Sequence, residues 1–177
     1  MSHPTAVAAR PLVTGRGRGE PIWHLGSLVE IVLSGPDTGG AFALVETEGR
    51  AGMQAPVHVH SREEETFQVL EGEVAFTVEG ATAVAGPGTV VHLPRGVPHS
   101  FRVISPTARF QNLISPAGFE NFFRELSEPA PERALPPEGQ GMEGLERLSE
   151  VCARFGVELL PGDRHPGSGG ALRAGEA

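Results

Sequence analysis

The stretch GMQAPVHVHSREEETFQVLEG, residues 52–72, decides both the fold and the site. His58 and His60 are two residues apart in a short extended segment, and side chains two apart on a strand point to the same face of a sheet. Glu65 follows five residues later, at the start of the next apolar run. The stretch predicts two strands that bring two imidazoles and a carboxylate together.

A second stretch, GTVVHLPRGVPH at residues 88–99, supplies a third imidazole. His99 stands at the head of an apolar segment and follows a turn rich in Pro and Gly. Three neutral imidazoles and one carboxylate suit Fe, Mn, Ni, Co, Cu or Zn, and they do not suit Ca or Mg. A lone His-x-His pair is a weak signal among seven histidines, so the residue types alone also allow structural or surface histidines.

Short apolar runs broken by Gly, Pro or charged residues surround these stretches, and several alternate with period two. This pattern predicts a mainly β sandwich or barrel rather than βαβ units. The predicted strands are Leu28–Leu33, Ala41–Thr47, Val57–His60, Thr66–Leu70, Val74–Val78, Val90–Leu93, His99–Ile104 and Ala108–Ile114.

The pattern changes after Pro116, where apolar residues recur at helical spacing over 118–126 and again over 142–155. A Pro-rich linker, 128–141, separates these two predicted helices. We therefore expect an extended N-terminal arm over 1–20, a β-barrel over 21–115, a C-terminal helical segment over 116–160 and a flexible tail over 161–177. The arm is either disordered or a strand that docks on a partner subunit.

Composition excludes several classes of function. A formal net charge of −8 argues against nucleic acid or an anionic membrane as a partner. All 14 basic residues are Arg, so Schiff-base chemistry on a lysine is excluded, and Tyr is absent. The single cysteine, Cys152, cannot form an intramolecular disulfide, and a cytoplasmic location fits the absence of an apolar leader or span.

The spacing of both stretches resembles the two motifs of the cupin superfamily. The matching positions are Gly52, His58, His60, Glu65 and Gly72, then Gly88, Pro94, Gly96 and His99. The flanking segments IWHLGSLVEIVLSGPDTGGAFALVE (22–46) and SPAGFENFFRELSEP (115–129) are similar to bacterial single-domain cupins of the quercetin 2,3-dioxygenase-like type. The resemblance implies a cupin jelly-roll β-barrel followed by two C-terminal α-helices. It also implies one divalent transition metal per chain, held by His58, His60, Glu65 and His99.

The same resemblance implies a metal-dependent dioxygenase that cleaves a flavonol or a related enol or phenol with O2. Glu65 would act as both ligand and catalytic base. Alternatives are a non-enzymatic cupin that binds a metal or small ligand, and a cupin isomerase. Isomerases of this superfamily usually carry a lysine in the barrel, which this chain lacks. Cupins often form dimers, so the resemblance further implies a homodimer.

Several further residues are candidates for the core or for a pocket. Alternation from Glu65 and His99 predicts that Phe67, Val69 and Phe101 face the interior, as ordinary core or as the wall of a substrate pocket, and Gln111 is a candidate polar pocket group. Three further expectations concern neighbouring residues: packing or structural roles for Trp23, His24 and His92, a solvated loop for Glu63 and Glu64, and a lid or packing layer for Phe119, Phe122 and Phe123.

Overall fold

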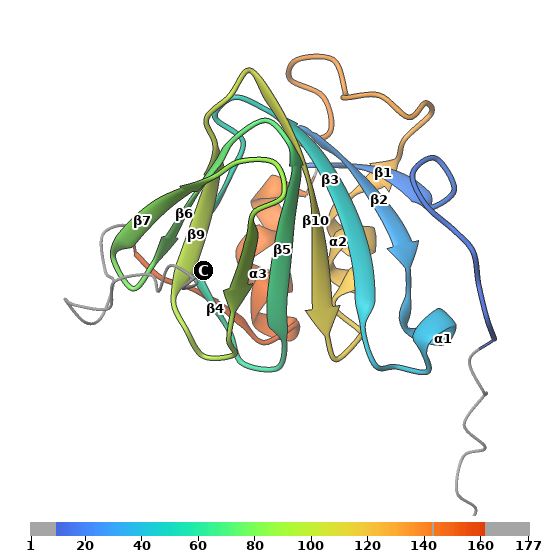
Figure 1. Ribbon diagram of the computed structural model, residues 1–177, viewed down its shortest axis with the longest axis horizontal. Helices are drawn as coiled ribbons and strands as arrows, with labels where there is room; N and C mark the ends of the chain where they lie inside the picture. The colour runs from blue at the N-terminus through green and yellow to red at the C-terminus, as the bar shows by residue number, and fades with distance from the viewer. Residues whose placement is uncertain (1–9, 143, 162–177) are drawn as a thin grey trace, which may run out of the picture.

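The protein is represented by a computed structural model that describes residues 10–142 and 144–161 (Figure 1). Its strands form two antiparallel sheets that face each other. The larger sheet has the order β11-β1-β2-β3-β10-β5-β8 and the smaller one β12-β4-β9-β6-β7. The strands of the larger sheet are β1 (Glu20–His24), β2 (Ser27–Leu33), β3 (Ala43–Arg50), β5 (Glu64–Glu71), β8 (Val90–Leu93), β10 (Thr107–Ser115) and β11 (Glu128–Pro129). Those of the smaller sheet are β4 (Gln54–His60), β6 (Val74–Val78), β7 (Ala81–Ala85), β9 (His99–Val103) and β12 (Val157–Leu159).

This mainly β architecture with two sheets is that of a cupin jelly-roll, but the predicted closed barrel needs correction. No hydrogen-bonded pairing joins the edges of the two sheets within the described parts of the chain. The sheets are held together by side chains from their inner faces, as in a sandwich. The chain crosses from one sheet to the other between β4 and β5, which places the two ligand-bearing strands of the first stretch in different sheets.

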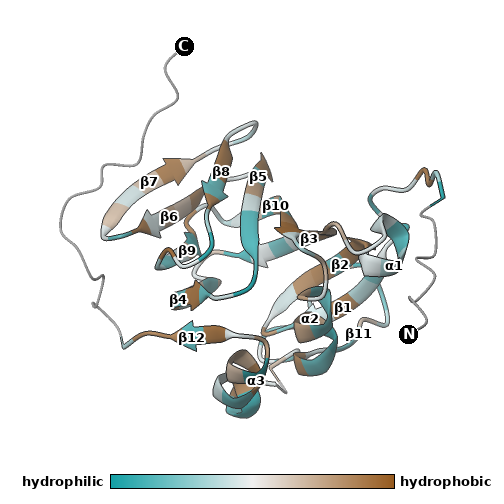
Figure 2. Cartoon of the chain, turned by 90° about the horizontal axis from the view of Figure 1, so that it is seen from below, coloured by the Kyte–Doolittle hydropathy of each residue, from teal (hydrophilic) through white to brown (hydrophobic). Residues whose placement is uncertain are grey.

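The helices are shorter than the sequence predicts. The structure has α1 (Gly35–Thr38), α2 (Glu120–Leu126) and α3 (Leu148–Arg154), with a 3₁₀ turn at Leu145–Arg147. Figure 2 shows α2 beside β1 and α3 beside β12.

Four strands were not predicted because they are short or rich in small residues: β1, β7, β11 and β12. Because β11 pairs with β1 and β12 pairs with β4, the segment 116–160 completes both sheets and is not a separate helical unit. The Pro-rich linker is also packed, since Nε1 of Trp23 donates to the Ala134 carbonyl at 2.9 Å.

The described part of the N-terminal arm, residues 10–19, reaches its own sheet. Its Gly17 amide donates to the Glu30 carboxylate at 2.9 Å, and Arg16 donates to Glu48 at 3.2 Å. Residues 1–9 of the predicted arm and 162–177 of the predicted tail lie outside the described residues.

The core consists of two apolar clusters. One joins β1, β2, β3 and β10 to α2, α3 and β12, and the other is rich in phenylalanine and joins β5, β6, β9 and β10. A cavity lies between the clusters, because its wall takes residues from both.

Candidate metal centre

The three motif histidines and Glu65 converge inside the sandwich. His58 and His60 come from β4, His99 from β9 directly opposite His58, and Glu65 from β5 of the facing sheet. One ligand atom from each residue lies within 4.8 Å of the others, and all four side chains are buried. Four polar groups converging in this way form a site that one ion can occupy.

Backbone carbonyls fix the orientation of two imidazoles. Nδ1 of His58 donates to the Pro56 carbonyl at 2.7 Å, and Nδ1 of His99 donates to the Val97 carbonyl at 2.9 Å. A carbonyl only accepts, so both rings carry their proton on Nδ1 and leave the Nε2 lone pair free for a metal.

The contact between His99 and Glu65 tests whether an ion fits. Nε2 of His99 lies 3.1 Å from Oε2 of Glu65. With the His99 proton on Nδ1, both facing atoms are acceptors, and two acceptors repel at this distance unless a proton or a cation lies between them. Oε2 also lies 3.4 Å from Nε2 of His60. The donor set and this juxtaposition fit a transition metal ion.

The protonation tendencies agree with a site built for a cation. Burial would raise the pKa of Glu65, but His60 and His99 beside it lower that pKa to about 2. Burial, together with His99, lowers the pKa of His58 to about 4. Burial also opposes charge on His60, but Glu65 and Glu63 outweigh it and raise the pKa of His60. The carboxylate is therefore ionised, and the imidazoles beside it stabilise its charge.

Two neighbours of the site were not anticipated. Asn112 on β10 is buried, and its Nδ2 donates to Oε1 of Glu65 at 2.6 Å. Glu63 was expected in a solvated loop, but it is buried, with Oε2 3.5 Å from Nδ1 of His60. Neither of those two atoms has another hydrogen-bond partner among the described residues.

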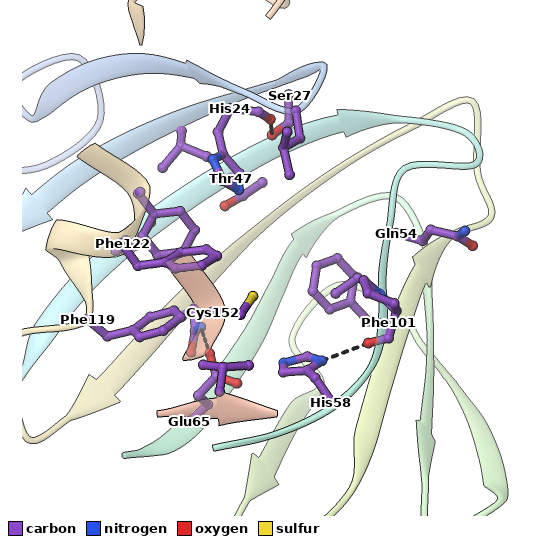
Figure 3. Close-up of a pocket in the computed structure, with 18 of the residues that line it drawn as sticks. His24, Ser27, Thr47, Gln54, His58, Glu65, Phe101, Phe119, Phe122 and Cys152 are labelled. Carbon is purple, nitrogen blue, oxygen red and sulfur yellow. Dashed lines mark hydrogen bonds between the residues drawn. The ribbon is translucent and has the colours of Figure 1, made fainter. Parts of the chain in front are cut away.

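A cavity of about 130 Å³ adjoins the cluster (Figure 3). Its wall is mainly apolar, and Phe67 and Phe101 lie on it, while Phe119 and Phe122 line it from the side of α2. The ring of Phe119 packs edge-on against His60 with centroids 4.7 Å apart. Phe119 and Phe122 therefore form part of the pocket wall as well as packing.

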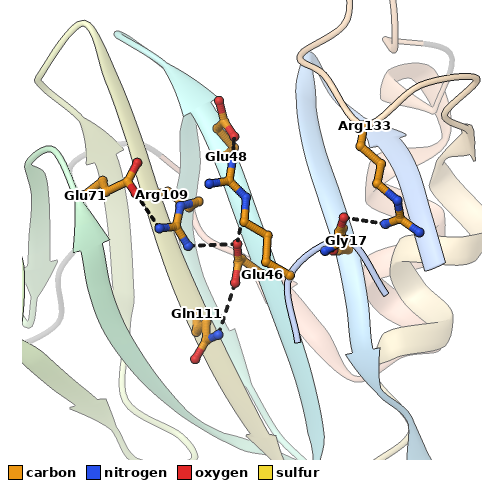
Figure 4. A network of polar contacts seen from close by, with 9 residues as sticks. Gly17, Glu46, Glu48, Glu71, Arg109, Gln111 and Arg133 are labelled. Carbon is orange, nitrogen blue, oxygen red and sulfur yellow. Dashed lines mark hydrogen bonds and ion pairs between the residues drawn. The ribbon is translucent and has the colours of Figure 1, made fainter. Parts of the chain in front are cut away.

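Two expected pocket residues lie elsewhere. Val69 faces inward but lies four residues beyond Glu65, in the phenylalanine-rich cluster and away from the cavity. Gln111 is on the outer face of the larger sheet, where its Nε2 donates to Glu46 at 3.1 Å beside Arg109 (Figure 4). Alternation explains the correction, because the inward residue is its neighbour Asn112.

Of the remaining residues discussed above, some line the cavity and others lie away from it. Trp23 is buried, as expected, and His92 contacts Thr66 on the exposed outer side. His24 lines the cavity, which the sequence did not favour, and so does the buried, free Cys152. Burial raises the pKa of the Cys152 thiol to about 11, so it is a protonated, apolar part of the wall at neutral pH.

Comparison with known proteins identifies the family. Residues 46–110 match the family described as Cupin domain. Together with the two-sheet fold and the convergent histidines, this match shows that the chain contains a cupin domain. The solved structures it resembles include a predicted oxalate decarboxylase from Thermotoga maritima (TM-score 0.54, 19% identity, covering 59% of this chain and 99% of that one). A second is an RmlC-like cupin from Shewanella frigidimarina (TM-score 0.52, 21% identity, covering 60% and 93%).

Two curated relatives are more informative about chemistry. The chain is 32% identical over 152 residues to quercetin 2,3-dioxygenase of Bacillus subtilis, which covers 86% of this chain and 45% of that protein. It is 27% identical over 117 residues to quercetin 2,3-dioxygenase of Aspergillus japonicus, covering 62% and 33%. The chain thus spans less than half the length of these relatives. Separately, none of the helices in the described ranges is long and apolar enough to cross a membrane.

Proposed function

We propose that this cupin is a metal-dependent dioxygenase that acts on an enol or phenol, of which a flavonol is one example. The observation that carries the proposal is the convergence of three imidazoles and a carboxylate beside an apolar cavity, with His58, His60 and Glu65 on its wall. Similarity over 152 residues to a quercetin 2,3-dioxygenase supports it. His58, His60, Glu65 and His99 would hold the ion, which would supply Lewis acidity and a site for O2 chemistry.

Glu65 is the residue of the chain best placed to take the substrate's acidic proton. One of its oxygens, Oε1, is held by Asn112 at 2.6 Å, and the other, Oε2, faces the imidazoles. Glu65 lines the cavity, so a hydroxyl group entering the site meets this carboxylate. The surrounding phenylalanine rings exclude water, which strengthens each polar contact inside the site.

Metal content of the purified protein tests the first half of the proposal. We expect about one equivalent of a redox-capable ion in the wild type and its loss in a His60→Ala/His99→Ala double variant. The matched control is His92→Ala, which removes an imidazole on the outer side of the sheet. Absence of metal after reconstitution would overturn the dioxygenase and leave a small-ligand-binding protein.

Oxygen uptake with 3-hydroxyflavone and simpler enols tests the second half. In a Glu65→Gln variant, part of the metal affinity should remain while most turnover is lost, because the amide coordinates weakly and cannot accept the proton. Full activity in this variant would exclude Glu65 as the base.

We also propose a homodimer in the cytoplasm. The free, buried thiol of Cys152 is compatible with a reducing compartment, and the exposed Val84 and Val90 lie on edge strands of the two sheets. Light scattering on the eluting protein measures the mass, and a monomer would exclude the dimer.

A further inference from the structure

The cavity has a second polar region, formed by His24 at the end of β1 and Thr47 on β3. Both residues line the cavity. Figure 3 shows them grouped at one end of the pocket, while His58 and Glu65 lie at the other. The cavity wall beside Thr47 is apolar, since its strand partners on the two sides, Val29 and Phe110, also line the cavity.

Thr47 lines the cavity, with 7% of the residue exposed. Its Oγ1 forms no hydrogen bond among the described residues and is not one of the fully buried atoms without a partner, so it is open to the cavity. A buried hydroxyl is normally hydrogen-bonded, because leaving it unpaired costs free energy. The free group facing a cavity is therefore accounted for by a ligand or solvent partner there.

His24 is held with one ring nitrogen available. Nδ1 and Oγ of Ser127 form a 2.8 Å hydrogen bond, and the ring packs edge-on against Phe123 at 5.1 Å. The tight turn of Leu25 (φ 46°) and Gly26 (φ 82°) fixes the end of β1, as two left-handed residues do in a type I′ hairpin. Nε2 has no partner among the described residues. Burial lowers the pKa of His24 to about 4, so the ring is neutral at pH 7 and Nε2 can donate or accept according to its tautomer.

The distance between the two polar regions suits one aromatic ring. The Cα atom of Thr47 is one strand away from that of Asn112 and two residues further along, which corresponds to about 8 Å within a sheet, and Asn112 in turn bonds the Glu65 carboxylate. The cavity volume of about 130 Å³ is close to that of apolar cavities that take up one benzene ring. Gln54 and Pro56 are exposed at the cavity wall, so a larger molecule would extend past them.

We propose that His24 and Thr47 form a recognition subsite, and that the substrate is an aromatic enol or phenol with a second hydrogen-bonding group across the ring. This inference rests on the proposed function, because it assumes that the first hydroxyl group lies at Glu65. The subsite selects between substrates and does not take part in the reaction. It rejects molecules that present an apolar group there, because Oγ1 of Thr47 and Nε2 of His24 would then be left unpaired.

The test is equilibrium binding of isosteric probes to the zinc-loaded protein, which separates recognition from turnover. Hydroquinone is compared with 4-methylphenol, and resorcinol with 3-methylphenol, by isothermal titration without oxygen. We expect the better dihydric phenol to bind about tenfold more tightly than its methyl counterpart, which is the usual effect of one hydrogen bond. In the Thr47→Val and His24→Phe variants most of this tenfold preference should be lost. The affinity for the methyl probe should stay within about twofold of the wild-type value. Thr107→Val, an exposed position on β10, is the matched control.

The outcomes separate the two proposals. Equal binding of the paired probes to wild type overturns the subsite and leaves the enol or phenol function standing. A preference that persists in both variants also overturns the subsite. Failure of all four probes to bind, with zinc retained, overturns the phenol-type substrate itself. Melting temperatures of the variants close to that of the wild type show that a lost preference is not due to unfolding.

Discussion

The amide group of Asn112 donates a 2.6 Å hydrogen bond to Oε1 of Glu65, and both side chains are buried. This contact leaves Oε2 facing His60 and His99. Asn112 therefore positions the carboxylate of Glu65 in the candidate site. Groups that orient metal ligands typically contribute 10–100-fold to metal affinity.

Replacing Asn112 by Leu should weaken zinc binding about tenfold or more, because Glu65 loses the bond that fixes its rotamer. Competition with a chromophoric chelator measures the affinity. Gln111→Leu is the matched control, since this neighbour lies on the opposite face of β10 and should leave zinc binding unchanged. Equal affinities for the two variants would show that Asn112 has no positioning role.

Glu63 should support His60 in the same way. Its carboxylate lies 3.5 Å from Nδ1 of His60, so it favours the tautomer that leaves Nε2 free to bind metal. We expect Glu63→Leu to lower zinc affinity about tenfold and Glu63→Gln, which keeps an acceptor oxygen, to lower it less. Glu64→Leu alters an exposed neighbour and serves as the control. The idea fails if the two Glu63 variants bind zinc as tightly as the Glu64 variant.

Glu120 links two segments far apart in the sequence. Its Oε1 accepts a hydrogen bond from the Gly35 amide at 2.8 Å and its Oε2 accepts one from the Gly118 amide at 2.6 Å, with only 2% of the residue exposed. Glu120→Ala should lower the free energy of unfolding by about 3 kcal/mol, because two amides lose their partner. Urea denaturation measures the loss, and Glu132→Ala at an exposed position should change it little. If Glu120→Ala lowers the free energy of unfolding no more than Glu132→Ala does, the linking role is contradicted.

Stability should depend on pH through His24. Burial lowers its pKa in the folded state from 6.5 to about 4, so between these values the unfolded chain binds a proton that the folded chain does not. The stabilising contribution of neutral, buried His24 to the free energy of unfolding is fully present above pH 6.5 and is lost as the pH falls through 4. Between pH 7.5 and 4.5 the free energy of unfolding of the wild type should therefore fall by about 2 kcal/mol more than that of the His24→Phe variant. Urea titrations in EDTA compare the two proteins without metal, and parallel losses would exclude the effect.

The sequence predicted the ligand cluster because motif spacing and strand alternation are local properties. His58 and His60 share a face wherever their strand lies, and Glu65 begins the next strand. The pocket wall was harder to predict. It depends on which strands become neighbours and how deep each residue lies, which is why Val69 was misplaced.

Asn112 and Gln111 are adjacent residues that face opposite sides of β10, and the wrong one of the two was predicted to line the pocket. Phe110 is apolar and inward, so alternation already placed Asn112 inward and Gln111 outward, and this signal was available in the sequence. Glu63 had no such signal, because its burial depends on the turn between the two sheets. The short strands β11 and β12 could also not be predicted from the local sequence pattern, since two or three residues carry almost no periodicity.

The pairing of β12 with β4 has a consequence for the order in which the site is built. Val157 lies opposite His60 and Leu159 opposite His58, so the outer edge of the ligand strand is completed by residues about one hundred positions later in the chain. On the ribosome, all four candidate ligands emerge well before this partner strand does. The site therefore passes through a stage in which its ligands are synthesised but one edge of β4 is open. The pairing that closes this edge is a long-range contact, the kind that lowers folding rates across proteins.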